Sequence, residues 1–148
     1  MAIIGLDTVV YAAPDMAKAR KFFTDWGLKR VSTSKSATVF ETEIGSQVIL
    51  KPPGARGLPP APVKGMNFRE MIWGVSSKSH LNRIAKELAR DREVTTDRDG
   101  TIHCLDPNRL GVGFRLWKRT RKPKSPRTPV NSHNSYERVD QLSRIYDR

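Results

Sequence analysis

The feature of this sequence that most constrains its fold is an order of hydropathy patterns that occurs twice. Each half starts with a strand pattern, continues with an amphipathic helix and ends with three short strand patterns. At an offset of 62 residues Val9 aligns with Met71 and Phe22 with Ile84, and the offset has grown to 64 at the last strand. Agreement of this kind predicts an internally duplicated β-α-β-β-β unit.

The first half has clear element boundaries. A helix is expected to begin near Asp15 and to end at Gly27, because a glycine commonly follows the last helical residue. Apolar residues at helical spacing predict one buried stripe, made of Met16, Ala19, Phe22, Phe23 and Trp26. Trp26 is therefore expected in the core. Strands are expected at 5–11, 28–33, 37–42 and 47–51.

The second half repeats this order after a segment with five prolines between positions 52 and 63. Because such a composition continues neither a helix nor a strand, residues 53–68 are expected to link two modules, 3–52 and 69–118. A second helix is capped within 76–79 and buries Leu81 and Leu88. The remaining strands are expected at 70–75, 93–96, 101–105 and 111–117.

Composition fits one soluble domain. The 148 residues are 37% hydrophobic and 28% charged, which allows a hydrophobic core. Cys104 is the only cysteine, so an internal disulfide is excluded and a reducing compartment fits. No apolar run reaches the roughly 20 residues that span a bilayer, and the N-terminus lacks the basic start of a secretory signal. We therefore expect a cytoplasmic protein with no membrane partner.

The basic charge is concentrated near the C-terminus. Of the net charge of +12, half lies in residues 118–148, which hold nine Lys/Arg and three Asp/Glu. Charge runs are usually solvated, and we do not expect nucleic acid as a partner. Residues 119–148 are rich in proline and basic side chains and are expected to form an extended tail. A tail of this kind is typical of the approach to another domain, so we expect the native chain to continue past Arg148.

The motifs that carry a family resemblance are the order of elements, the opening 5–11, the helix 15–23 and the turn Asp106-Pro107-Asn108-Arg109 before the last strand. Together they resemble the vicinal oxygen chelate superfamily of glyoxalases, bleomycin resistance proteins and extradiol dioxygenases. The resemblance covers residues 3–118 and is closest to the N-terminal domain of extradiol ring-cleavage dioxygenases. It implies an α+β fold in which two tandem βαβββ modules form curved mixed sheets that enclose a cavity.

The resemblance also says where metal ligands would stand. In the superfamily they are usually His and Glu, and they project from the first and last strands of the modules. The matching positions here are Thr8, Glu70, Ile49 and Gly113. Because one carboxylate does not make a site, we expect no cofactor in this chain, and Fe(II) or another divalent metal in a companion domain. An alternative is a site completed across a dimer, with Glu70 as one ligand.

Two other sets of residues are candidates for chemistry. Glu70 and His103 form an acid/base pair if both face the cavity, and the alternative is that His103 is hydrogen-bonded or surface-facing. On the last strand Gly113, Arg115 and Trp117 share one face, which suits a planar or anionic ligand. The alternative there is that the glycines mark a close backbone approach and that Arg115 is solvated. Cys104 is expected to be a small buried hydrophobe.

Two functions follow from these expectations. One is the N-terminal, metal-free domain of an extradiol-type dioxygenase, which cleaves catechols in aromatic compound catabolism, beside a C-terminal glyoxalase-like domain. The other is a stand-alone homodimer of the bleomycin-resistance type that binds a small aromatic or anionic molecule without catalysis. Whether this chain is itself an enzyme stays open, because it lacks the metal ligands that the resemblance leads us to expect.

Overall fold

The structure, a computed structural model, describes residues 2–117. The predicted basic tail at 119–148 lies outside the described residues. The elements, in chain order, are β1 (Ile3–Ala12), α1 (Met16–Asp25), β2 (Lys29–Thr33), β3 (Thr38–Glu41), β4 (Gln47–Lys51), β5 (Phe68–Val75), α2 (Lys78–Leu88), β6 (Thr95–Thr96), β7 (Ile102–Leu105) and β8 (Gly111–Leu116). The order β-α-β-β-β thus occurs twice, on either side of residues 52–67.

Local side-chain chemistry sets the ends of both helices. The Asp15 carboxylate accepts hydrogen bonds from the first-turn amides of Ala17 and Lys18, at 3.1 and 2.9 Å, and Ser77 caps α2 in the same way. After α1, Gly27 adopts a φ of 96°, the left-handed conformation that glycine tolerates best. Neither helix of the described chain is long and apolar enough to cross a membrane.

All eight strands belong to one open mixed sheet, in the order β2-β3-β4-β1-β5-β8-β7-β6. Within each half the first and last strands pair in parallel, β1 with β4 and β5 with β8, and the two halves join through the antiparallel pair β1–β5. The predicted α+β class with a mixed sheet is confirmed, and the strands of both halves belong to one continuous sheet. The reason is that β1 and β5 would otherwise leave a row of backbone N–H and C=O groups unpaired.

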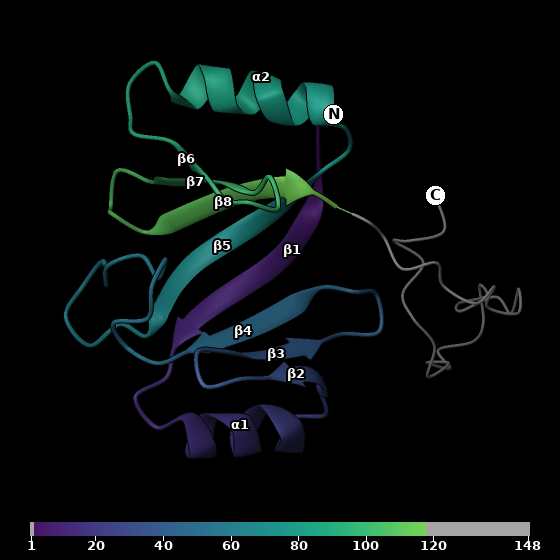
Figure 1. Ribbon diagram of the computed structural model, residues 1–148, viewed down its shortest axis with the longest axis vertical. Coiled ribbons are helices and arrows are strands. Elements are labelled where there is room, and N and C mark those ends of the chain that lie inside the picture. The colour runs from purple at the N-terminus through teal and green to yellow at the C-terminus, as the bar shows by residue number, and fades with distance from the viewer. Residues whose placement is uncertain (1, 118–148) are drawn as a thin grey trace, which may run out of the picture.

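Both helices lie on the same face of this sheet. Val9 of β1 stands directly opposite Met71 of β5, so the two side chains point to one face. Val9 packs in the cluster that contains residues of α1, and Trp73, two positions after Met71, packs in the cluster that contains residues of α2. Figure 1 shows the two helices at opposite ends of the molecule, with the strands between them.

Each half has its own hydrophobic cluster. The first is centred on the buried residues Ala13, Phe40, Val48 and Leu50, and the second on Val75, Leu81, Ile102 and Phe114. The prediction that Trp26 belongs to the core is wrong, since this side chain is 66% exposed. The reason is that α1 ends at Asp25, so Trp26 stands at the cap and contacts the rings of Phe22 and Phe23 at the surface.

Within residues 2–117 the opposite face of the sheet carries no helix, yet its centre is buried. Thr8 and Val10 of β1 and Glu70 and Ile72 of β5 are among the least exposed residues of the chain. Residues on this face alternate with those that face the helices, and it is the face that holds Glu70, His103 and Arg115. The candidate functional residues are therefore gathered on one side of the sheet.

Candidate functional site

Glu70 and His103 meet across β8, the strand that separates their own strands. Glu70 of β5 pairs in register with Gly111, and His103 of β7 pairs with Gly113. A Cβ at position 113 would lie 2.9 Å from Ile72 Cγ1 and 3.3 Å from Glu70 Oε1. The glycine therefore leaves the space that the Glu70 carboxylate needs in order to reach the histidine.

The two side chains form a close hydrogen-bonded pair. His103 Nδ1 lies 2.7 Å from Glu70 Oε1, and Glu70 is only 3% exposed. The hydrogen bond to this carboxylate raises the pKa of His103, and the charges of Glu70 and Asp97 act in the same direction against the desolvation of the ring. The pair is thus an imidazole poised to hold a proton beside a buried carboxylate.

Asp97 lies on the other side of the imidazole ring. Its Oδ2 is 3.3 Å from His103 Nε2, within ion-pair distance, and among residues 2–117 this buried nitrogen has no hydrogen bond of good geometry. The Asp97 side chain is 71% exposed and stands where β6 passes into the turn 97–100. The resemblance pointed to Glu70 as a ligand position, and the shared sheet suggested its pairing with His103, whereas nothing in the local pattern singled out Asp97.

A cavity of about 410 Å³ opens beside this pair. Its lining combines Glu70, His103 and Asp97 with apolar groups from the linker and from β7, namely Leu58, Pro59, Pro60 and Leu105. Cys104 also lines it. Burial raises the pKa of the Cys104 thiol, and its Sγ lies 3.6 Å from the Val112 carbonyl oxygen, so the expected role as a buried small hydrophobe is confirmed.

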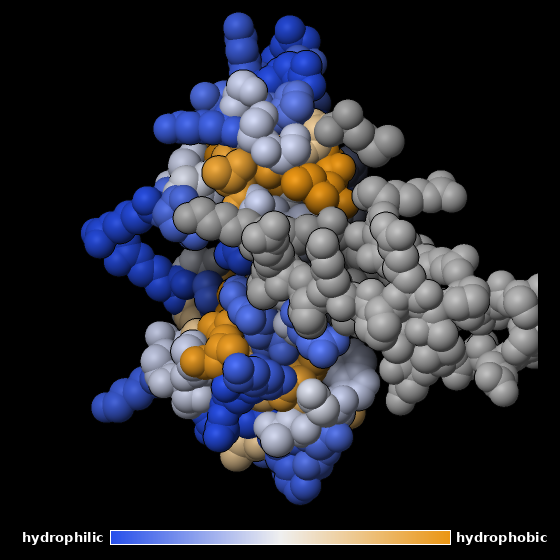
Figure 2. Space-filling model, turned by 90° about the vertical axis from the view of Figure 1, so that its right-hand side faces the viewer, coloured by the Kyte–Doolittle hydropathy of each residue, from blue (hydrophilic) through white to orange (hydrophobic). Residues whose placement is uncertain are grey.

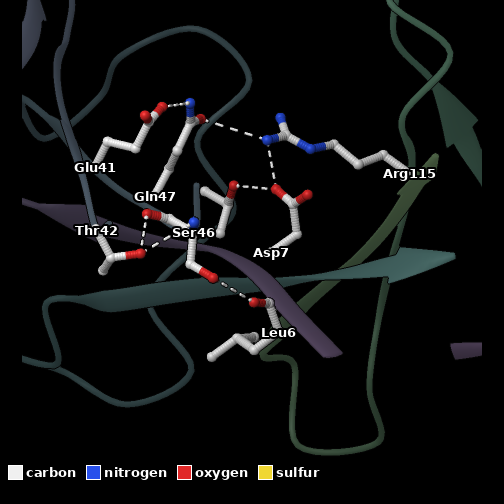
Figure 3. Close-up of polar contacts among 8 residues, drawn as sticks. Leu6, Asp7, Glu41, Thr42, Ser46, Gln47 and Arg115 are labelled. Atoms are coloured by element: carbon white, nitrogen blue, oxygen red, sulfur yellow. Dashed lines mark hydrogen bonds and ion pairs between the residues drawn. The ribbon is translucent and has the colours of Figure 1, made fainter. Parts of the chain in front are cut away.

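Arg115 belongs to a second polar cluster that joins the two halves of the chain. Figure 3 shows its guanidinium group directed at Asp7 of β1 and at Gln47 of β4. Asp7 is 1% exposed, pairs with Arg115 and accepts a hydrogen bond of 2.7 Å from Thr8 Oγ1. Gln47 accepts from Arg115 at 3.4 Å and donates to Glu41 at 3.3 Å.

Arg115 is therefore an ion-pair partner rather than the solvated cation that the sequence left as an alternative. Its side chain is 26% exposed and lines a hollow of about 820 Å³ together with Asp7 and Trp117. Sequence reasoning missed Asp7. The available signal was a charged residue inside a strand rich in β-branched residues, since a charge buried there needs a partner.

The expected ligand face of Gly113, Arg115 and Trp117 is filled in part by the protein's own side chains. Ile72 and Glu70 occupy the space above Gly113, and the Trp117 ring lies against Gly5 and Gly74. A Cβ at Gly74 would come within 2.6 Å of Trp117 Cβ. A ligand-binding role for this face stays a prediction, and open space lies both in the hollow beside Arg115 and Trp117 and beside Glu70 and His103.

The groups at the four expected ligand positions do not fit a divalent metal. Thr8 Oγ1 is bonded to Asp7, Ile49 offers no donor atom, and Gly113 has no side chain. Glu70 is bonded to His103 through the nitrogen that faces it. Within residues 2–117 no group of three or more His, Cys, Asp or Glu side chains is arranged to hold a metal ion. A dimer-completed site with Glu70 as one ligand stays a prediction.

Comparisons with known proteins bear on the fold. No family model matches the sequence, and no curated protein matches it. Among solved structures, an extradiol ring-cleaving dioxygenase from B. fuscum is similar. The match covers 81% of this chain and 34% of the dioxygenase chain, with 15% sequence identity and a TM-score of 0.64. Homoprotocatechuate 2,3-dioxygenase from Arthrobacter globiformis is similar over 81% and 38%, with 16% identity and a TM-score of 0.61.

The chain has the vicinal oxygen chelate fold of the extradiol dioxygenases. A variant of homoprotocatechuate 2,3-dioxygenase from Brevibacterium fuscum gives the same result, with 16% identity and a TM-score of 0.62. The resemblance inferred from the motifs is therefore confirmed at the level of the fold. The chain spans between about a third and two fifths of the length of these enzymes.

Proposed function

We propose that this chain is a metal-free supporting domain of an extradiol-type dioxygenase, acting beside a glyoxalase-like companion domain that holds the divalent metal. The proposal rests on the residues that stand at the four expected metal-ligand positions. Three of these positions have no side chain able to bind a metal firmly. The carboxylate at the fourth, Glu70, is hydrogen-bonded to His103. Because this chain spans only part of the length of the dioxygenase chains, the remainder is long enough for a companion domain of similar size.

An apolar surface at one end of the sheet supports the idea of a companion. Ile3 and Ile4 of β1 and Leu116 of β8 are exposed, and Ile3 and Leu116 flank Val75 in register. The ladder between β1 and β4 begins only at Thr8, so the start of β1 has a backbone edge outside that ladder. Figure 2 faces the side where β1 begins and β8 ends, and shows apolar patches there.

Metal loading tests the proposal. The full chain is incubated anaerobically with Fe(II) and desalted, its iron is counted by mass spectrometry, and it is assayed for catechol cleavage. We expect close to zero iron per chain and no catechol cleavage, because the four expected positions offer one carboxylate, already hydrogen-bonded to His103, where a metal site needs several ligands. A stoichiometry near one, lost on Glu70→Ala, would overturn the proposal and favour a dimer-completed site.

A second candidate function is a stand-alone small-molecule binding protein of the bleomycin-resistance type. The observation that favours it is the cavity of about 410 Å³, which is of the size of ligand sites in proteins and combines apolar walls with a few polar groups. Sedimentation analysis distinguishes the two candidates in part. A stable dimer of this chain alone favours the binding protein, whereas a monomer favours a domain that awaits its companion.

A further inference from the structure

The hairpin at one edge of the sheet is weakly attached to the rest of the fold. Its outer strand, β6, is only Thr95–Thr96 and lies at the end of the strand order beside β7. The turn 97–100 is exposed along its length, and the amides of Asp97 and Gly100 donate its hydrogen bonds at 2.8 and 3.0 Å. Short exposed edge segments of this kind open at a lower free energy than the central strands of a sheet.

His103 of β7 stands between two carboxylates, one from the centre of the sheet and one from this turn. Its Nδ1 lies 2.7 Å from Glu70 Oε1, and its Nε2 lies 3.3 Å from Asp97 Oδ2. A neutral imidazole carries one N–H, so it donates to one carboxylate and turns an unprotonated nitrogen towards the other. Only the imidazolium carries N–H on both nitrogens. The Asp97 carboxylate is therefore attracted to the ring when His103 is protonated and loses that attraction when His103 is neutral.

Negative charge predominates around the ring. The charged groups near it are Glu70 on β5, Asp97 and Asp99 in the turn, and Arg92 and Glu93, which line the same cavity. The linker residues 57–60 that line this cavity carry no charge, and on β8 Gly113 stands beside His103 while Arg115 pairs with Asp7. Carboxylates thus outnumber cations, and this surrounding favours the imidazolium form.

His103 is the group here whose charge responds to pH near neutrality, because imidazole has its usual pKa in that range. The hydrogen bond to Glu70 raises the pKa of His103 above its usual 6.5. The hydrogen bond from the Thr101 amide lowers the pKa of Asp99, and burial raises the pKa of the Cys104 thiol. The carboxylate of Asp99 therefore stays charged and the thiol stays neutral while His103 loses its proton.

We propose that the turn 97–100 is a pH-sensitive flap, held at the cavity by Asp97 while both nitrogens of His103 carry a proton and released when one proton leaves. The structure shows the held arrangement, in which Thr95 and Asp97 line the cavity. The proton on the ring is the switch, and the weakly attached hairpin is the element that it biases. The inference goes beyond the proposed function, because it needs neither a metal nor a companion domain.

Hydrogen exchange of the turn amides tests the flap. The full chain, in buffer with a metal chelator, is studied by NMR at pH 6 and pH 9, and the exchange rates of the Asp97 and Gly100 amides are divided by their intrinsic rates. We expect their protection to fall by about 3-fold between the two pH values, the size typical of an ion pair with an exposed partner. Amides of the β1–β5 ladder report global unfolding. Equal protection of the turn at both pH values, or a fall no larger than that of the ladder, would overturn the inference.

A variant of the turn carboxylate locates the contact. Asp97→Asn removes the charge and keeps the side-chain shape, and the fold tolerates it because this side chain is 71% exposed. We expect the difference in turn protection between pH 6 and pH 9 to disappear in this variant. We also expect the pH at which the His103 ring resonances titrate to fall, because one of the two carboxylates that hold its proton is gone. A pH difference that survives in Asp97→Asn contradicts the inference.

Two matched controls keep the rest of the molecule unchanged. Asp99→Asn alters a carboxylate of the same turn whose hydrogen bond comes from the Thr101 amide. His80→Gln removes a histidine that bonds to Ser76 at the start of α2 and does not line the cavity. The difference in turn protection should persist in both variants, and its loss in either would contradict a flap held by Asp97 and His103. None of these outcomes alters the iron content on which the proposed function is tested.

Discussion

At the scale of single residues, the Glu70–His103 pair depends on a residue that has no side chain. Gly113 lies between the two strands that carry the pair, and any Cβ there would press on Ile72 and on the Glu70 carboxylate. A Gly in a strand normally weakens the strand, and here it provides the space in which a buried acid meets a base. The two glycines of β8 are thus explained by close packing, which was one of the two readings that the sequence allowed.

The raised pKa of His103 makes a prediction about stability and pH. Because the folded state holds the proton more tightly than the unfolded chain, the pair stabilises the fold fully below about pH 6.5, the unfolded value for histidine. This stabilisation is lost as the pH rises through the folded pKa of His103. We therefore expect the free energy of unfolding of the unaltered chain to exceed that of His103→Gln by more at pH 6 than at pH 9, as measured by urea denaturation.

The control for this titration is again His80→Gln. It removes an imidazole that has no contact with Glu70, so the loss of stability with rising pH should persist in this variant. A difference between the unaltered chain and His103→Gln that stays constant from pH 6 to pH 9 would show that Glu70 does not hold the proton of His103 in the way the geometry indicates.

At the scale of elements, most of the fold follows from the sequence because each element carries its own signals. Strand β4 was predicted with the bounds that it has, and α1 begins after Asp15 and stops before Gly27 as its caps indicate. Short β6 was predicted as 93–96 and is only Thr95–Thr96, the two residues that pair with His103 and Ile102 of β7. The joining of β1 to β5 was not predicted, since periodicity within one strand does not name its neighbour.

The face of α1 was predicted less well than its ends. A helical stripe read from the sequence covers more than 100° of the surface, and only its centre contacts the sheet. Phe23 packs against the first core cluster and lies 5.7 Å from the Phe40 ring, between centroids, whereas Phe22 is 61% exposed. Helical spacing alone does not separate two adjacent aromatic residues of this kind.

This difference predicts unequal costs for two adjacent substitutions. Phe23→Ala should lower the free energy of unfolding by about 3 kcal/mol, because it leaves a void against Phe40. Phe22→Ala should lower it by less than about 1 kcal/mol, because the ring is 61% exposed and its ring contacts are with Phe23 and Trp26 on α1 and its cap. Urea denaturation of both variants gives the comparison. Equal losses would mean that the exposed aromatic group of α1 is covered in solution.

At the scale of the whole molecule, the contacts that join the two halves within residues 2–117 include the β1–β5 ladder and the ion pair of the buried Asp7 with Arg115. The β1–β5 ladder runs along the middle of the sheet, and near it Asp7 of the first half pairs with Arg115 of the second. Gln47 extends this cluster to β4 (Figure 3). The partners lie at opposite ends of the described sequence, so no local pattern could have predicted their contact. Each half has its own core, and this polar contact adds to the β1–β5 ladder where the halves meet.

Breaking the pair on one side should therefore cost more than removing it. Arg115→Ala leaves the Asp7 carboxylate buried without its cation, and we expect the free energy of unfolding to fall by about 3 kcal/mol. Adding Asp7→Asn to Arg115→Ala removes the stranded charge and should restore part of that loss. Arg90→Ala is the matched control, because Arg90 pairs with Glu87 at the exposed surface and should cost at most about 0.5 kcal/mol. Urea denaturation of all three variants measures these values. If the double variant is less stable than Arg115→Ala alone, the Asp7 carboxylate is stabilised by groups other than Arg115, and the ion pair does not hold the two halves together.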